Sequence, residues 1–126
     1  MSQFDTDVLV WLQRNNPQAI RIVDSTFTRF ISVQTYMELL QTAQNKTQLK
    51  WVKDFLSEYE FEILPLTQNI GHRAAIYVEN YTLSSGMYSG DAIIAATAVE
   101  NNLALISGNK KHFKNIPSLQ LKVFKP

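Results

Sequence analysis

Short apolar runs and helix-spaced apolar stripes follow one another along the whole chain. The runs are rich in β-branched and aromatic residues and predict strands, whereas stripes at three- and four-residue spacing predict helices. Strands are expected at about Phe4, 28–33, 61–66, 103–106 and 121–124. Because strands alternate with helices, the pattern predicts an α/β fold, a three-layer α/β/α arrangement around a mostly parallel sheet of four to five strands.

Capping residues mark the starts of the predicted helices. Asn16 before Pro17 predicts a helix that reaches about Asp24, and Asn45 and Thr67 each precede a further helix with an apolar stripe. Pro65 interrupts the third strand and favours an edge position or a strand end. The segment 83–90 is rich in serine and glycine and is expected to be a loop.

Two acids, Asp5 and Asp7, directly follow the opening apolar residues. Burying an unpaired carboxylate is costly, so we expect Asp5 at the exposed carboxyl end of the strand. Ligands bind at that edge in open α/β sheets, and paired oxygen donors suit a hard cation such as Mg²⁺. The alternative is that Asp5 or Asp7 only caps the helix that follows.

Two further acids lie on predicted helices. Asp91 begins an alanine-rich, almost wholly apolar stretch, typical of a buried helix, whose dipole favours an ionised carboxylate at its amino end. A helix cap is the alternative role for Asp91. Glu38 lies opposite the stripe that contains Leu39 and Leu40, so it faces away from the local core. Ser107-Gly108-Asn109 leaves the fourth strand at the edge expected for Asp5.

The totals narrow the class of protein. At 126 residues the chain is expected to form one domain, 1–126, and 45% hydrophobic with 18% charged residues is typical of ordinary globular proteins. A net charge of +1 excludes a general basic field for nucleic acid. Cysteine is absent, which excludes disulfides and zinc–thiolate sites and favours the cytoplasm. With neither a leader pattern nor a membrane-length apolar run, we expect no membrane association.

Local cations are therefore the candidates for nucleic-acid contact. Lys46, Lys50 and Lys53 form a basic stripe on one predicted helix, where solvation is the usual role and a Lys50–Asp54 pair is expected one turn apart. Contact with RNA or an acidic partner is the alternative. Lys110 and Lys111 follow the fourth strand. Lys46, Lys50, Lys110 and Lys111 are the candidate RNA-binding residues.

The chain resembles the PIN-domain ribonucleases, most closely the short bacterial toxins of the VapBC type, over essentially its whole length. The segments that carry the resemblance are Asp5-Thr6-Asp7-Val8-Leu9, Glu38-Leu39, Asp91-Ala92-Ile93-Ile94-Ala95-Ala96-Thr97-Ala98 and Ser107-Gly108-Asn109-Lys110-Lys111-His112-Phe113. Each motif is weak alone, but their order, spacing and predicted structural contexts together are fairly specific.

The resemblance implies a parallel sheet and a site for divalent metal. Asp5, Glu38 and Asp91 fall on the family's metal-binding and catalytic acids, which makes the polar face around Glu38 a cleft wall. Mg²⁺ or Mn²⁺ is the implied cofactor. Asn109 could hold a metal-bound water, and Thr6, Asp7 and Ser107 are expected around the ligands, with Ser107 donating to a carboxylate such as Asp5. The implied partners are RNA, including transfer RNA, and a cognate antitoxin whose tail enters the cleft, with a homodimer or higher assembly expected.

One stretch departs from the family pattern, because Ser107-Gly108-Asn109 stands where Thr-x-Asn or Thr-x-Asp is common. Three carboxylates in place of four predict weaker cation binding. Gly108 replaces an arginine found in many relatives and so removes a candidate phosphate contact. His112 is interpreted as a structural residue or an RNA contact and not as a metal ligand.

The main hypothesis is metal-dependent hydrolysis of RNA phosphodiester bonds. Without metal, at least one of the three acids should have a raised pKa. A PIN fold that has lost turnover and serves as an RNA- or partner-binding module is one alternative. Another is a haloacid-dehalogenase-like phosphatase, with Asp5 as nucleophile and Asp7 as acid/base.

Overall fold

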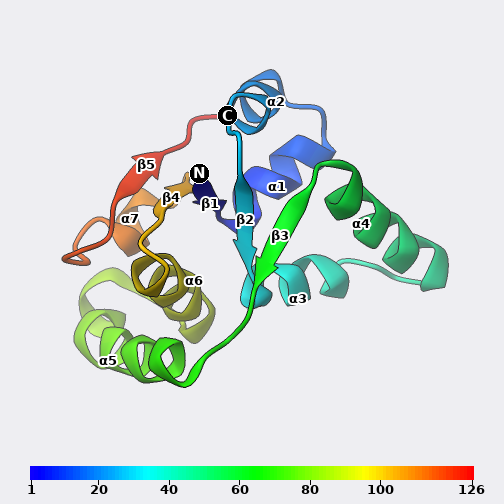
Figure 1. Ribbon diagram of the computed structural model, residues 1–126. Helices are drawn as coiled ribbons and strands as arrows, with labels where there is room; N and C mark the ends of the chain where they lie inside the picture. Colours follow the sequence, from blue (N-terminus) through cyan, green and yellow to red (C-terminus); the bar gives the residue numbers. More distant parts are fainter.

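The computed structural model describes residues 1–126 as a five-stranded sheet with helices on both sides (Figure 1). The strands are β1 (Ser2–Phe4), β2 (Arg29–Ser32), β3 (Phe61–Leu64), β4 (Ala104–Ser107) and β5 (Leu121–Val123). The helices are α1 (Thr6–Gln13), α2 (Pro17–Asp24), α3 (Val33–Gln41), α4 (Lys46–Glu58), α5 (Gln68–Ser85), α6 (Ser89–Glu100) and α7 (Lys110–Phe113). Every strand pair is parallel, which confirms the predicted fold class.

Two separate apolar cores pack against the two faces of the sheet. Helices α1 to α4 pack on one face and α5 to α7 on the other (Figure 1). Successive strand residues supply opposite cores, because side chains alternate along a strand. Ile106 belongs to the core under α1 to α4, and its neighbour Leu105 belongs to the core under α5 to α7. Gln3 is fully buried and donates from Nε2 to the carbonyl oxygen of Ile94 in α6 (2.9 Å), which ties β1 to that layer.

The strand order β3-β2-β1-β4-β5 reverses beside β1. The chain moves outward from β1 through β2 to β3, and then α5 and α6 carry it back over the other face so that β4 pairs with β1. Beyond the last paired residues, Phe4 and Ile106, the Asp5 amide donates to the Ile106 carbonyl oxygen (2.9 Å). Such a reversal opens a crevice at the carboxyl ends of the two strands.

Short-range signals located most of the element boundaries. Asn16, Asn45 and Thr67 cap the helices they were expected to cap. Pro65 directly follows β3, which lies at the edge of the sheet as predicted. Strand ends shift by one or two residues: Val33 starts α3 because the Ser32 hydroxyl accepts a hydrogen bond from the Thr35 amide (3.0 Å) and caps that helix.

The predicted loop 83–90 is wrong over most of its length. Helix α5 continues to Ser85 and α6 begins at Ser89. Gly86 ends α5 in the left-handed conformation with φ of 69°, which glycine adopts without strain. The serine at position 85 is tolerated because its hydroxyl donates to the Tyr81 carbonyl oxygen (2.9 Å). No helix combines the length and apolar character needed to cross a membrane.

Candidate active site

An open, wholly polar cavity of about 430 Å³ lies where the strand order reverses. Its lining comes from the loop after β1, from the start of α1, from α3, from α6 and from the loop after β4. The fold therefore brings together the three candidate acids and their candidate neighbours. The lining residues are Asp5, Thr6, Asp7, Glu38, Asp91, Gly108 and Asn109.

Asp5 is buried, contrary to the expectation of an exposed carboxylate. Its side chain stands at the predicted carboxyl end of β1 but is only 6% exposed. Burial is possible because both oxygens accept hydrogen bonds: the Thr6 amide donates to Oδ1 (2.7 Å) and the Ser107 hydroxyl donates to Oδ2 (2.7 Å). Asp5 is also the N-cap of α1, so the capping role and a place in the cavity are both realised.

Burial, reinforced by the negative charges of Asp7 and Asp91, raises the pKa of Asp5 to about 7. The hydrogen bonds from Ser107 and Thr6 oppose this shift without cancelling it. The expectation that at least one acid has a raised pKa in the metal-free chain is met by Asp5. A carboxylate in this state is well placed to gain from a nearby cation, which removes the cost of ionising it.

Asp7 joins α1 to the loop after β4. Its Oδ1 accepts from the Val8 amide (2.8 Å) and its Oδ2 from the Gly108 amide (2.9 Å). Burial raises the pKa of Asp7, and these backbone donors act in the opposite direction. A Cβ at position 108 would lie 2.8 Å from Asp7 Oδ2, so the close approach of the two segments needs glycine there.

Glu38 lies on α3, half-buried on the wall of the cavity. The Thr6 hydroxyl donates to Oε1 (2.5 Å) and Gln34 Nε2 donates to Oε2 (3.1 Å). Gly90, at the start of α6, packs so closely that a Cβ there would lie 3.1 Å from Glu38 Oε2. Helices α3 and α6 therefore meet at this carboxylate.

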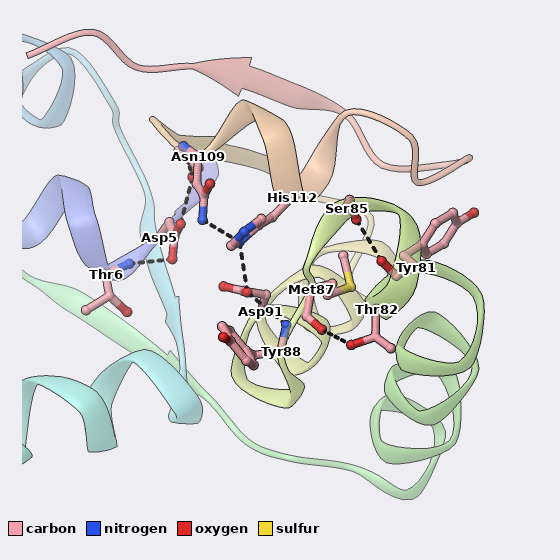
Figure 2. A network of polar contacts seen from close by, with 11 residues as sticks. Asp5, Thr6, Tyr81, Thr82, Ser85, Met87, Tyr88, Asp91, Asn109 and His112 are labelled. Carbon is pink, nitrogen blue, oxygen red and sulfur yellow. Dashed lines mark hydrogen bonds and ion pairs between the residues drawn. The ribbon is translucent and has the colours of Figure 1, made fainter.

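Asp91 is held from two sides, one of which the sequence analysis did not foresee. The Tyr88 amide donates to Asp91 Oδ2 (3.2 Å), and Nδ1 of His112 lies 3.0 Å from the same oxygen (Figure 2). The same Nδ1 is 2.8 Å from the Asn109 amide nitrogen. His112 Nδ1 thus lies between Asp91 and Asn109, and one ring nitrogen either donates to the Asp91 carboxylate or accepts from the Asn109 amide, according to its tautomer. The available signal was that Asn109 and His112 are three residues apart at the start of a helix and so share a face.

None of the four candidate RNA-binding lysines lines the cavity. Lys110 and Lys111 are exposed at the start of α7, directly after Asn109. Lys46 and Lys50 lie on α4, which is at the periphery of the molecule (Figure 1). The predicted pair is present, with Lys50 Nζ 2.6 Å from Asp54 Oδ2, but both side chains are exposed. Both roles of the α4 stripe, solvation or contact with RNA, stay open, and the α7 pair is the nearer source of positive charge.

The donors around the cavity fit a hard divalent cation by their chemistry. Carboxylate and amide oxygens are what Mg²⁺ and Mn²⁺ prefer, and a cation beside Asp5 would offset the burial and the neighbouring acids that raise its pKa. No three His, Asp or Glu groups are gathered closely enough to form a ready metal cluster. Thr6 and Gln34 hold Glu38, while His112 holds Asp91, so binding partly through water fits this arrangement better than direct ligation by every acid.

The fold and the cavity place the chain among parallel α/β proteins with an acidic site at the carboxyl ends of the strands. A sequence profile of the PIN domain matches residues 4–119, so the chain belongs to the PIN domain family. This membership confirms the resemblance drawn from the motifs. Because the PIN domain accounts for most of the chain, the haloacid-dehalogenase alternative has no support.

Several solved structures are similar to this chain over nearly its whole length, and one of them is a toxin–antitoxin complex. A toxin–antitoxin complex from Klebsiella pneumoniae has a chain 30% identical to this one, with a TM-score of 0.80 over 94% of this chain and 95% of that chain. VapBC2 from Rickettsia felis, bound to a promoter DNA fragment, is 23% identical to this chain and has a TM-score of 0.77 over 98% of each chain. FitAcB from Neisseria gonorrhoeae is 23% identical and has a TM-score of 0.74 over 100% of this chain and 98% of that chain. Comparison with curated protein sequences gives no match.

Proposed function

We propose that this chain is a ribonuclease that hydrolyses RNA phosphodiester bonds with the help of Mg²⁺ or Mn²⁺. The observation that carries the proposal is the gathering of Asp5, Glu38 and Asp91, which are distant in the chain, around one open polar cavity where the strand order reverses. Membership of the PIN domain family supports it.

Asp5, Glu38 and Asp91 would hold the cation, with Asn109 contributing through a water molecule. Bound there, the cation would supply an activated water and neutralise charge on the scissile phosphate. The remaining contacts orient the acids: Ser107 fixes Asp5, and Thr6 fixes both Asp5 and Glu38. Asp7 keeps the loop after β4 against α1 and so sets the position of Asn109.

The RNA backbone must be attracted by charges outside the cavity, because its own lining is acidic. Lys110 and Lys111 are the first candidates, since they directly follow Asn109. Lys46 and Lys50, on α4, would contact only an RNA that extends beyond the cavity. This arrangement is consistent with a structured RNA such as transfer RNA.

We further infer that the chain is the toxin of a type II toxin–antitoxin pair in the cytoplasm, as a homodimer or higher assembly. The similar structures from toxin–antitoxin complexes support this role, and the absence of cysteine is consistent with a reducing compartment. An open reading frame for a small DNA-binding protein directly upstream is expected. Its product should bind the chain and suppress cleavage.

The test compares RNA cleavage by the wild type, Asp5→Asn and Asp91→Asn with Mg²⁺ or Mn²⁺ and with a chelator. Transfer RNA and short single-stranded RNAs serve as substrates, and Asp54→Asn on the exposed face of α4 is the matched acid control. We expect the wild type and Asp54→Asn to cleave the RNA, and Asp5→Asn and Asp91→Asn not to cleave it. The chelator should abolish cleavage by the two active proteins. Equal background cleavage in all variants would contradict the nuclease proposal.

A binding module without turnover is the second candidate. The absence of a ready cluster of three metal-binding side chains favours it. In that case the wild type and Asp91→Asn would retain RNA equally, and neither would cleave it.

A further inference from the structure

Tyr88 is an aromatic residue exposed directly beside the candidate acids. Its side chain is 76% exposed at the N-cap of α6, although large aromatic rings are usually well covered. Its amide donates to Asp91 Oδ2 (3.2 Å), and its ring extends beside Asp91 (Figure 2). The ring therefore stands at the rim of the acidic cavity.

The backbone that carries Tyr88 is firmly anchored on both sides. Met87 before it is fully buried, and the Thr82 hydroxyl donates to the Met87 carbonyl oxygen (2.6 Å). Gly90 after it packs against the Gln34 and Glu38 side chains of α3. The exposed ring is thus presented from a fixed corner of the fold, which lowers the entropic cost of using it for binding.

The cavity itself offers no surface on which a nucleobase could stack. It contains no aromatic or aliphatic side chain, its acids repel phosphate, and the nearest lysines lie outside it. An uncharged stacking contact would add affinity without depending on the sign of the local field. Stacking on an aromatic side chain is the usual way in which proteins hold unpaired bases.

We propose that Tyr88 stacks on the nucleobase next to the scissile phosphate and so selects an unpaired nucleotide at the cleavage site. This inference rests on the proposed ribonuclease function and adds how the substrate is held. A base inside a helix has both faces covered by its neighbours, so only a splayed or single-stranded nucleotide can present a face to Tyr88.

Another exposed aromatic residue provides a matched control. Phe27 is 100% exposed in the segment that enters β2, at the amino ends of the parallel strands and thus at the opposite end of the sheet from the cavity. Phe27→Ala removes a comparable exposed ring without touching the site. Tyr88→Phe keeps the ring face and removes only the hydroxyl.

The experiment measures the binding of a fluorescent single-stranded RNA in the presence of Mg²⁺. All chains carry Asp5→Asn, so that the RNA is not cleaved during the measurement. They carry in addition Tyr88→Ala, Tyr88→Phe, Phe27→Ala or no second substitution. Tyr88→Ala is expected to weaken binding roughly 10- to 100-fold, while the other two leave it unchanged. One abasic position, scanned along the RNA, should weaken binding by the chain with Tyr88 and leave Tyr88→Ala unaffected. An exposed side chain is not needed for folding, and thermal unfolding checks this for each variant.

Unchanged binding by Tyr88→Ala, an equal loss in Phe27→Ala, or an abasic penalty that is the same with and without Tyr88 would each overturn the inference. Failure of the proposed function looks different. Tyr88-dependent binding without acid-dependent cleavage by the wild type would contradict the nuclease alone, whereas acid-dependent cleavage with Tyr88-independent binding would contradict the stacking alone.

Discussion

Asp5 combines two structural states that usually exclude each other in a carboxylate. Each of its oxygens accepts a hydrogen bond, from Thr6 and from Ser107, and yet its pKa is raised to about 7, because burial and two neighbouring acids outweigh those bonds. A residue in this state makes the free energy of unfolding depend on pH.

Asp5→Asn is expected to stabilise the metal-free protein above pH 7 and to change little near pH 4. The folded state holds the Asp5 proton more tightly than the unfolded chain, whose carboxyl titrates near 3.8. Stability therefore falls as pH rises from about 4 to about 7, by a few kcal/mol, and asparagine removes this loss. Urea denaturation in the presence of a chelator, at pH 4 and at pH 8, measures the difference in the free energy of unfolding between the wild type and Asp5→Asn. A wild type more stable than Asp5→Asn at pH 8 would contradict the raised pKa.

His112→Ala is expected to lower metal affinity or RNA cleavage about 10- to 100-fold, because it removes the ring that packs between Asp91 and Asn109 and contacts both. Isothermal titration with Mn²⁺ and the cleavage rate measure the two effects. His72→Ala on the exposed side of α5 is the matched control and should behave as the wild type. Wild-type metal affinity and cleavage in His112→Ala would show that His112 does not position the acids.

The sequence could place individual acids but not their surroundings. Asp5 was correctly located at the end of β1, because an apolar run followed by an acid is a local signal. Its burial was not foreseen, since the donor that makes burial possible, Ser107, lies 102 residues away. The contact of His112 with Asp91 is likewise a long-range contact, and the metal role of the three acids stays a prediction.

Among the elements, the loop after β4 is the most constrained. Gly108→Ala is expected to destabilise the protein by about 1–3 kcal/mol, because the new methyl group would meet Asp7 at 2.8 Å and the Phe124 carbonyl oxygen at 3.2 Å. Gly71→Ala is the opposite case: it lies in helix α5 with nothing within 4 Å, so alanine should stabilise by about 0.5–1 kcal/mol. Thermal or urea denaturation separates them. Equal effects of the two substitutions would contradict the close packing of Asp7 on Gly108.

Element starts were more predictable than the connection between α5 and α6. Asn45 and Thr67 cap their helices through their own side chains, which is a local interaction. In contrast, Ser85 and Ser89 are helical because tertiary packing of α5 against α6 outweighs the preference of serine for loops. The loop preference of serine alone therefore could not predict that these residues are helical.

At the scale of the whole molecule, metal binding should appear as added stability. A cation that binds only the folded chain stabilises it by about 2.7 kcal/mol at one hundred times its dissociation constant, which raises Tm by several degrees. We expect this for the wild type and Asp54→Asn with Mg²⁺ or Mn²⁺, and not for Asp91→Asn. Thermal unfolding against metal concentration measures the shift. A rise in Tm that is equal in Asp91→Asn would place the cation elsewhere.

Alternation of strands and helices was sufficient to predict a parallel three-layer fold, since few other architectures cover both faces of such a sheet. The strand order was not predicted, because sequence periodicity does not record which strand neighbours β1. The position of the reversal beside β1, which creates the cavity, is a property of the assembled sheet.

The Ser107–Asp5 hydrogen bond joins residues 102 positions apart and has a consequence for synthesis of the protein. Asp5 directly follows β1 and is translated before β2 and β3, whereas Ser107 is the last residue of β4 and Asn109 comes after it. An incomplete nascent chain, or one cut before β4, lacks one wall of the cavity. The complete cavity can therefore form only after β4 and the loop that follows it have been synthesised.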